Sequence, residues 1–181
     1  MVGGGFIIPY AEYESVEVMK RAAEVLRNLI PRGINKELAY TFIGNTKLTG
    51  DSFGPMAGSI VSSYISSLGS TSKVFGTMDE PITTFNINKY RNGIIDNYYT
   101  IAIGSTYSPY NESSILIHKG GYKLGKENKY IGDIVILYRL VNCHTVRDLA
   151  NYNEKRVQRA TTFITWVIYF LELELNKRGG L

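Results

Sequence analysis

The sequence predicts a single α/β domain, a three-layer α-β-α sandwich built around a mixed, mostly parallel central sheet. Short apolar runs typical of strands alternate along the chain with longer segments that carry an apolar stripe at helical spacing. The 181 residues have the length of one domain, and 44% of them are hydrophobic, which is enough to bury a sizeable core. Because no internal repeat or linker divides the chain, we expect one domain over residues 1–181.

The first half of the chain predicts two helices separated by a strand. Apolar residues recur at helical spacing over residues 12–30, and Pro31 ends this pattern. A buried strand is expected over residues 39–44, where β-forming residues lead to a glycine. After a polar loop, Pro55 marks the first turn of a second helix that continues to Gly69, since proline has no N–H to leave unpaired there.

The second half of the chain continues the alternation of strands and helices. We expect four strands, at residues 73–76, 98–103, 114–118 and 131–140. A short helix is expected at 83–90, a loop rich in glycine and lysine at 120–130, and a long final helix at 153–177. The final helix is apolar on nearly all sides, which indicates burial against more than the sheet. A homodimer formed through this helix is one explanation of the surplus.

Composition narrows the classes of function and the compartment. The formal charge of +4 is dispersed along the chain, a pattern more typical of a solvated surface than of a nucleic-acid binder. Cys143 is the only cysteine, so no intramolecular disulfide can form, and a reducing compartment is the natural expectation. The first residues lack the basic region of a secretory signal, and the most apolar helical run, residues 160–171, is too short to span a bilayer. We therefore expect a cytoplasmic protein without membrane association.

Three polar loops should follow strands at the carboxyl edge of the sheet, where such folds place their sites. They cover residues 44–54, 76–81 and 104–109. If the first two strands are neighbours, Asp51 and Asp79 would face each other and could divide acid and base roles or bind a metal ion. The plainer alternatives stay open: Asp51 as a helix cap or loop acceptor, and Asp79 as a solvated acid in a turn.

Other familiar sites are disfavoured. The first loop has neither the Gly-Lys-Ser/Thr end of a phosphate-binding loop nor a G-x-G-x-x-G pattern, and no G-x-S-x-G elbow occurs. Cys143 and His144 are adjacent, so along an extended chain they face opposite sides and cannot pair as nucleophile and base. His118 ends a predicted strand and could reach the crevice as a metal ligand.

Two segments resemble the motifs of a known family. Residues 43–58 contain Thr-Gly-Asp-Ser-Phe-Gly-Pro-Met-Ala-Gly, which resembles the T-G-D-[SA]-x-G-P-x-x-G signature of the YyaC-type sporulation proteins. Residues 74–82, Val-Phe-Gly-Thr-Met-Asp-Glu-Pro-Ile, resemble the second motif, with Asn86 following as in that family. Gly-Asp-Ile at 132–134 is a third match, and the resemblance covers most of the chain from Ala39 onward.

The resemblance implies a phosphorylase/hydrolase-like fold related to the spore germination protease and to hydrogenase-maturation endopeptidases. It makes Asp51 the leading catalytic acid with Asp79 as its partner, and a divalent metal ion held by Asp51 and His118 is the variant that the maturation endopeptidases imply. No organic cofactor is implied. The partner would be a protein or peptide substrate in the mother cell or forespore of a sporulating bacterium. Its contacts are expected on the two loops, from Asn45, Thr49, Gly50, Ser105 and Thr106.

One departure from the family pattern matters for activity. Family members carry an Ile-Asp-Ala type of turn at the end of the strand that matches residues 99–103, whereas this chain has Gly104 followed by Ser105 and Thr106. A hydroxyl cannot replace an ionised carboxylate as a base or as a hard metal ligand. The sequence therefore supports two hypotheses: an endopeptidase that acts at an acidic crevice, and a catalytically degenerate relative that binds a partner or has a structural role.

Overall fold

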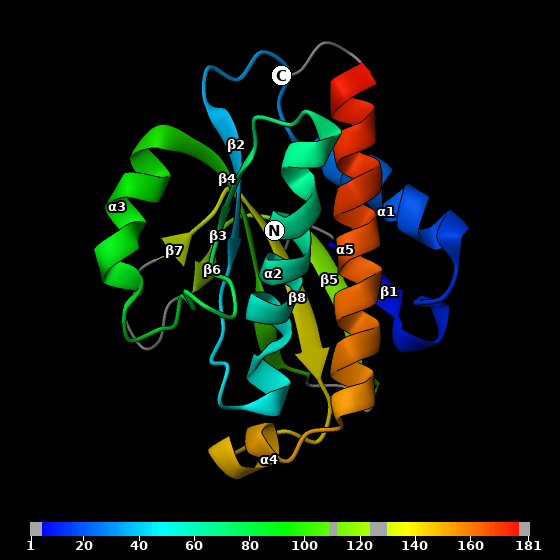
Figure 1. Ribbon diagram of the computed structural model, residues 1–181. Helices are drawn as coiled ribbons and strands as arrows, with labels where there is room; N and C mark the ends of the chain where they lie inside the picture. The colour runs from blue at the N-terminus through cyan, green and yellow to red at the C-terminus, as the bar shows by residue number, and fades with distance from the viewer. Residues whose placement is uncertain (1–4, 109–111, 124–129, 178–181) are drawn as a thin grey trace.

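A six-stranded mixed sheet forms the centre of the protein (Figure 1). The computed structural model describes residues 5–108, 112–123 and 130–177, so residues 124–129 of the predicted loop and residue 109 lie outside the described part. Four neighbouring strands are parallel, whereas β5 runs antiparallel to β8 and β1 antiparallel to β5. In sheet order the strands are β1 (Phe6–Pro9), β5 (Ser114–Lys119), β8 (Ile134–Leu140), β4 (Tyr98–Tyr107), β2 (Glu37–Phe42) and β3 (Lys73–Phe75).

Helices cover both faces of this sheet, which confirms the predicted three-layer α/β sandwich. One face carries the three longest helices, α1 (Val16–Leu29), α2 (Phe53–Ile65) and α5 (Glu154–Lys177), and Figure 1 shows α2 and α5 side by side. The other face carries α3 (Ile87–Asn97) and a two-stranded sheet of β6 (Tyr122–Lys123) and β7 (Tyr130–Ile131). The remaining elements are short: η1 (Tyr10–Glu12), η2 (Thr49–Asp51), η3 (Ser66–Leu68) and α4 (Val146–Ala150).

Alternation along the central strands explains the two apolar cores. On β4, Ile101 and Ile103 pack into the large core beneath α1, α2 and α5. Ala102, between them, belongs to the smaller core, which includes Ile87 and Ile94 of α3. Successive side chains on a strand point to opposite faces, so a run that is apolar throughout must be covered on both sides.

The structure differs from the predicted elements at several ends. The first strand, Phe6–Pro9, was not predicted, because an apolar run of four residues is too short to show a clear period. The helix expected at 83–90 forms over Ile87–Asn97, after a turn in which the Asn86 side chain accepts a hydrogen bond from the Thr83 N–H. The strand expected at 131–140 is broken at Gly132, whose φ of 98° favours glycine.

The order of the strands reverses beside β2. From β2 the chain moves outward to β3 and then crosses back to β4 on the other side of β2. The connection that leaves β2 therefore runs away from β4 at the carboxyl ends of the strands, and α/β folds place ligands at such switch points. The short helix α4 lies at this end (Figure 1). Among the described residues, no helix is long and apolar enough to cross a membrane.

Candidate functional site at the carboxyl edge of the sheet

Glycines allow the loop after β2 to fold back on the strand that it leaves. A Cβ atom on Gly44 would collide with the backbone oxygen of Asp51, and one on Gly54 would collide with the backbone oxygen of Ile43. Pro55 lies in the first turn of α2, where its missing N–H leaves no helical hydrogen bond unmade. The loop therefore returns to the end of β2 and places η2, with Asp51 as its last residue, at the carboxyl end of the sheet.

Asp51 links this loop to β4 through both oxygens of its carboxylate. The Ser105 hydroxyl donates to Oδ1 at 2.7 Å, and the Asn45 backbone N–H donates to Oδ2 at 2.9 Å. Ser105 is buried, and 54 residues separate it from Asp51 in the chain. The structure thus brings Asn45, Asp51 and Ser105 together, at the point where the strand order reverses.

The environment of Asp51 favours its protonated form. Burial raises the pKa of the carboxyl above its ordinary value, and the hydrogen bonds from Ser105 and Asn45 lower it without offsetting the burial. Asp51 therefore takes up a proton more readily than an exposed aspartate does. This is the behaviour expected of a general acid or base, and also of a carboxylate held inside a folded loop.

Tyr122 occupies the space beside Gly104. A Cβ atom on Gly104 would lie 2.8 Å from Cε2 of the Tyr122 ring and 3.1 Å from the backbone oxygen of Ile43. The Tyr122 hydroxyl donates to the backbone oxygen of Ser105 at 3.0 Å, which fixes the ring at this position. Burial, followed by the nearby charge of Asp51, raises the pKa of the Tyr122 hydroxyl, so it remains a donor at neutral pH. The sequence did not single out Tyr122, because its approach to β4 is a tertiary contact.

Two further side chains lie within electrostatic reach of Asp51. Burial raises the pKa of the Cys143 thiol, and the charges of Asp148 and Asp51 raise it further, so the thiol stays protonated at neutral pH. Tyr107, at the end of β4, is half exposed, and the pKa of its hydroxyl is raised by burial and then by Cys143, Asp51 and Asp148. Cys143 is buried whereas His144 is exposed, in agreement with the expectation that the two do not pair.

The segment of α4 closes over η2. The Thr49 hydroxyl donates to the backbone oxygen of Ala150 at 3.0 Å, and a Cβ on Gly50 would lie 3.1 Å from a methyl group of Leu149. A capping box starts α4: the Thr145 hydroxyl accepts from the Asp148 N–H, while the Asp148 carboxylate accepts from the Thr145 N–H. Thr49 and Gly50, predicted to contact substrate, therefore lie beneath this cover.

Three predicted site residues lie away from Asp51. Asp79 is exposed in the turn after β3, and no hydrogen bond or ion pair between described residues joins it to Asp51, although β2 and β3 are neighbours as expected. Thr106 follows Ser105 on β4, so its side chain points to the other face. His118 pairs with Val135 near the start of β8, whereas Ser105 pairs with Tyr138 near its end. Since β5 runs antiparallel, His118 lies toward the opposite edge of the sheet.

The residues at this edge do not fit a resident metal ion. His118 lies toward the opposite ends of the parallel strands, and no hydrogen bond or ion pair between described residues joins Asp79 to Asp51. Within the described part of the chain, no group of three or more His, Cys, Asp or Glu side chains could hold a metal ion.

The fold and this edge define the class of protein: an α/β sandwich with a polar loop and a partly buried aspartate at the switch point of its sheet. The chain belongs to the family described as "Protein of unknown function (DUF1256)", which matches residues 10–165. The matched range includes every residue assigned above to the site. No curated protein and no solved structure matches the chain.

Proposed function

We propose that this protein is a catalytically degenerate, germination-protease-like protein that binds a protein partner at the carboxyl edge of its sheet. The motifs at residues 49–58 and 74–82 support the relationship, and through it a role in the cytoplasm of the mother cell or forespore during sporulation. In this proposal the crevice is a recognition surface, and Asp51 organises the loop that forms it.

The position of Tyr122 is the observation that carries this proposal. The resemblance places a further active-site acid at residue 104, in addition to Asp51 and Asp79, yet a Cβ there would lie 2.8 Å from the Tyr122 ring. Glycine and the tyrosine ring are therefore complementary, and an aspartate at 104 is incompatible with the ring where it lies. Two-carboxylate hydrolysis needs both groups at the same substrate, one to activate water and one to donate a proton. This chain retains one such group beside the crevice.

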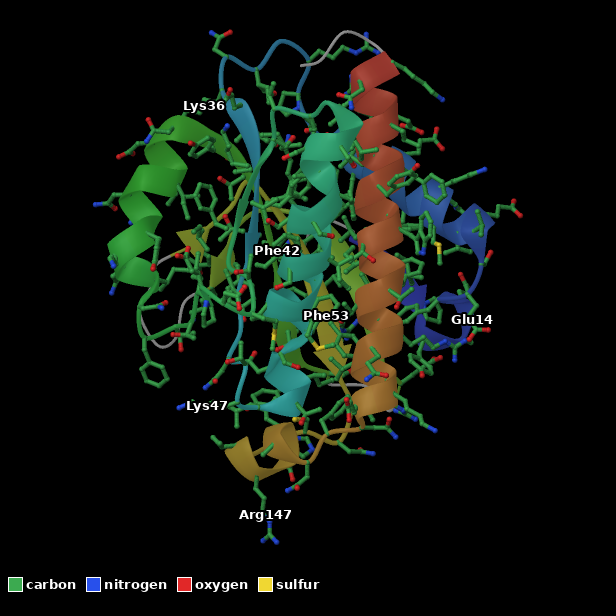
Figure 2. The ribbon with its side chains drawn as sticks, in the orientation of Figure 1. Glu14, Lys36, Phe42, Lys47, Phe53 and Arg147 are labelled. Atoms are coloured by element: carbon green, nitrogen blue, oxygen red, sulfur yellow. The ribbon has the colours of Figure 1, made fainter. Side chains whose placement is uncertain are left out.

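Exposed apolar side chains at the same edge support a binding role. Met78, Phe85 and Val146 lie in loops or a short helix that follow parallel strands, Tyr107 is the last residue of β4, and all four side chains are exposed. Phe85 is 90% exposed, although burial of an apolar side chain of this size is favourable. Lys47 and Arg147 extend from this end as well (Figure 2). Apolar groups among charges at one edge are typical of a protein-binding surface.

The test selects peptides and then asks whether they are bound or cleaved. A random peptide library is selected on the wild-type protein, and the selected peptides are titrated against a Phe85→Ser/Tyr107→Ser variant and against Ile60→Ser. Ile60 is the matched control, because it is exposed on α2 away from this edge. We expect at least about tenfold weaker binding to the double variant alone, and intact peptides after long incubation with wild type. Equal loss in both variants, or peptide cleavage, would refute the proposal.

An endopeptidase remains the second candidate, and the raised pKa of Asp51 is the observation that favours it. With its proton, Asp51 could protonate a leaving amine, and the Ser105 hydroxyl is placed to hold the carboxyl in position. Mass spectrometry of the same peptides separates the two candidates. Cleavage by wild type that is lost in Asp51→Asn and kept in Asp79→Asn would establish the enzyme with Asp51 as its acid.

We also propose that two copies associate through α5. Trp166 is 46% exposed and Val16 53% exposed on either side of a largely apolar groove of about 550 Å³ between α5 and the start of α1. Light scattering after gel filtration tests this at micromolar concentration. A dimer that Trp166→Glu converts into a monomer is expected, and a wild-type monomer would remove the proposal.

A further inference from the structure

A buried glutamate lies at the opposite edge of the sheet from Asp51. Glu172, on α5, is 1% exposed, yet it lines a pocket of about 400 Å³ at the amino ends of β2 and β3. The labelled Lys36 marks this end in Figure 2, far from Lys47 and Arg147 at the other end. None of the motifs discussed above includes Glu172, so neither the fold family nor the crevice accounts for it.

Neutral hydroxyls hold one oxygen of this carboxylate. The Tyr40 hydroxyl donates to Oε1 at 2.5 Å, and the Ser72 hydroxyl donates to the same atom at 2.8 Å. Burial and the carboxylate raise the pKa of Tyr40, which keeps its hydroxyl as a donor. Oε2 accepts no hydrogen bond from the described residues. Because Glu172 lines the pocket, a ligand there would lie beside its carboxylate, where Oε2 is left to accept a hydrogen bond.

No cation of the described chain neutralises Glu172. Lys36 lines the same pocket, but its ammonium group donates to the backbone oxygen of Ile95 at 2.8 Å. Glu37 adds a second, exposed carboxylate at the rim. A buried carboxylate needs an opposite charge or full hydrogen bonding to be stable, and two hydroxyls on one oxygen supply only part of that.

The residues that line the pocket indicate what kind of cation would fit beside Glu172. Apolar side chains of Ile34, Leu38 and Leu175 line the pocket together with Glu172, and the helix-to-strand loop at residues 70–72 completes the wall. An aliphatic stem would pack on the apolar side chains while its charged head reaches Oε2. We propose that this pocket binds a primary ammonium or guanidinium group carried on a short aliphatic chain, with Glu172 as its counter-ion.

Such a group can come from a free amine or from a lysine or arginine side chain, and the probes distinguish these sources. Isothermal titration calorimetry is carried out with n-butylamine and agmatine as free amines and with Nα-acetyl-lysine amide, whose side-chain ammonium is free, as a side-chain mimic. The uncharged control is n-butanol. Glu172→Gln keeps the shape and can still accept from Tyr40 and Ser72. Glu174→Gln, two residues along α5 and lining a different pocket, is the matched control.

We expect at least one cationic probe to bind wild type and Glu174→Gln with the same affinity. The same probe should bind Glu172→Gln at least about tenfold more weakly, and n-butanol should bind none of the three proteins. The tightest probe class then identifies the source. Thr71→Arg, which places a guanidinium at the pocket wall, provides a second measurement and should weaken binding similarly. The proposal is overturned if no cationic probe binds wild type at about 10 mM, or if Glu172→Gln binds as wild type does.

Discussion

Replacing Gly104 by alanine tests directly whether Tyr122 fills the place of a second acid. The added Cβ would lie 2.8 Å from the ring and 3.1 Å from the Ile43 oxygen, well inside the roughly 3.5–4.0 Å of a favourable carbon contact. Overpacking of this kind costs about 1–3 kcal/mol, whereas the reduced freedom of the unfolded chain returns about 0.5 kcal/mol. We therefore expect Gly104→Ala to lower the free energy of unfolding by about 1.5 kcal/mol.

Urea denaturation followed by circular dichroism measures this change, with Gly93→Ala as the control. A Cβ on Gly93 meets nothing within 4 Å, and the residue lies in α3, so alanine there should stabilise the protein by about 0.8 kcal/mol. The same pair of substitutions is then made in a Tyr122→Ala background. With the ring removed, Gly104→Ala should cost at least about 1 kcal/mol less than in wild type.

Two results would refute this reasoning. A neutral or stabilising Gly104→Ala would mean that the ring moves aside freely and leaves room for a side chain at residue 104. An equal cost with and without the Tyr122 ring would mean that the Ile43 oxygen, and not the ring, sets the limit. In either case, the Tyr122 ring would not be what excludes an acidic side chain at residue 104.

Three further predictions concern single side chains. Burial raises the folded-state pKa of Asp51, so the stability that its proton contributes is lost as the pH rises through that pKa; in urea titrations Asp51→Asn should therefore gain stability relative to wild type as the pH rises above the ordinary carboxyl pKa of about 4. Backbone hydrogen bonds from His144 and Thr145 lower the pKa of Asp148, so its contribution is present above the ordinary carboxyl pKa and lost in acid; Asp148→Ala should lower the melting temperature at neutral pH, and an unchanged value would contradict the role of its capping box. Tyr40→Phe removes a donor to a buried carboxylate and should cost about 2 kcal/mol in chemical denaturation; a loss below about 0.5 kcal/mol would mean that Glu172 is held by other groups.

The sequence predicted the layers of this fold because each layer leaves a periodic signal. The run at 39–44 and the stripe at 12–30 correspond to β2 and α1, and their alternation with later elements defined the sandwich. Ends of elements were less accurate. The first helix begins at Val16, because Ser15 caps it by accepting from the Val18 N–H.

The site was only partly predictable, because its contacts join distant parts of the chain. Asp51 was proposed from its place in the loop after a strand, and Asn45 as a substrate contact in the same loop; their hydrogen bond was not predicted. Ser105 was proposed from a loop expected at residues 104–109, but the structure places it in β4, and its hydrogen bond to Asp51 depends on strand order. Tyr122 had no local signal at all, since only the packing of β6 against β4 brings its ring to Gly104.

His118 shows why a strand-end argument needs direction as well as position. In a parallel strand, the last residue would lie at the crevice with Asp51. Because β5 is antiparallel to β8, its last residues face the amino ends of the parallel strands. The pattern of apolar residues carries no direction, so the sequence placed His118 at the wrong edge for a ligand shared with Asp51.

The packing of α1 against α5, which lies far from it in the sequence, has a consequence for synthesis. Strand β1 pairs Phe6 with Ile117 of β5, and α1 packs against α5, which ends at Lys177. A ribosome releases β1 and α1 long before their partners exist, so the apolar side of α1, with Met19 and Leu26, must wait in contact with solvent or a chaperone. Yield in a cell should therefore depend on how fast translation delivers α5, the last helix, to a nascent chain that cannot close its core without it.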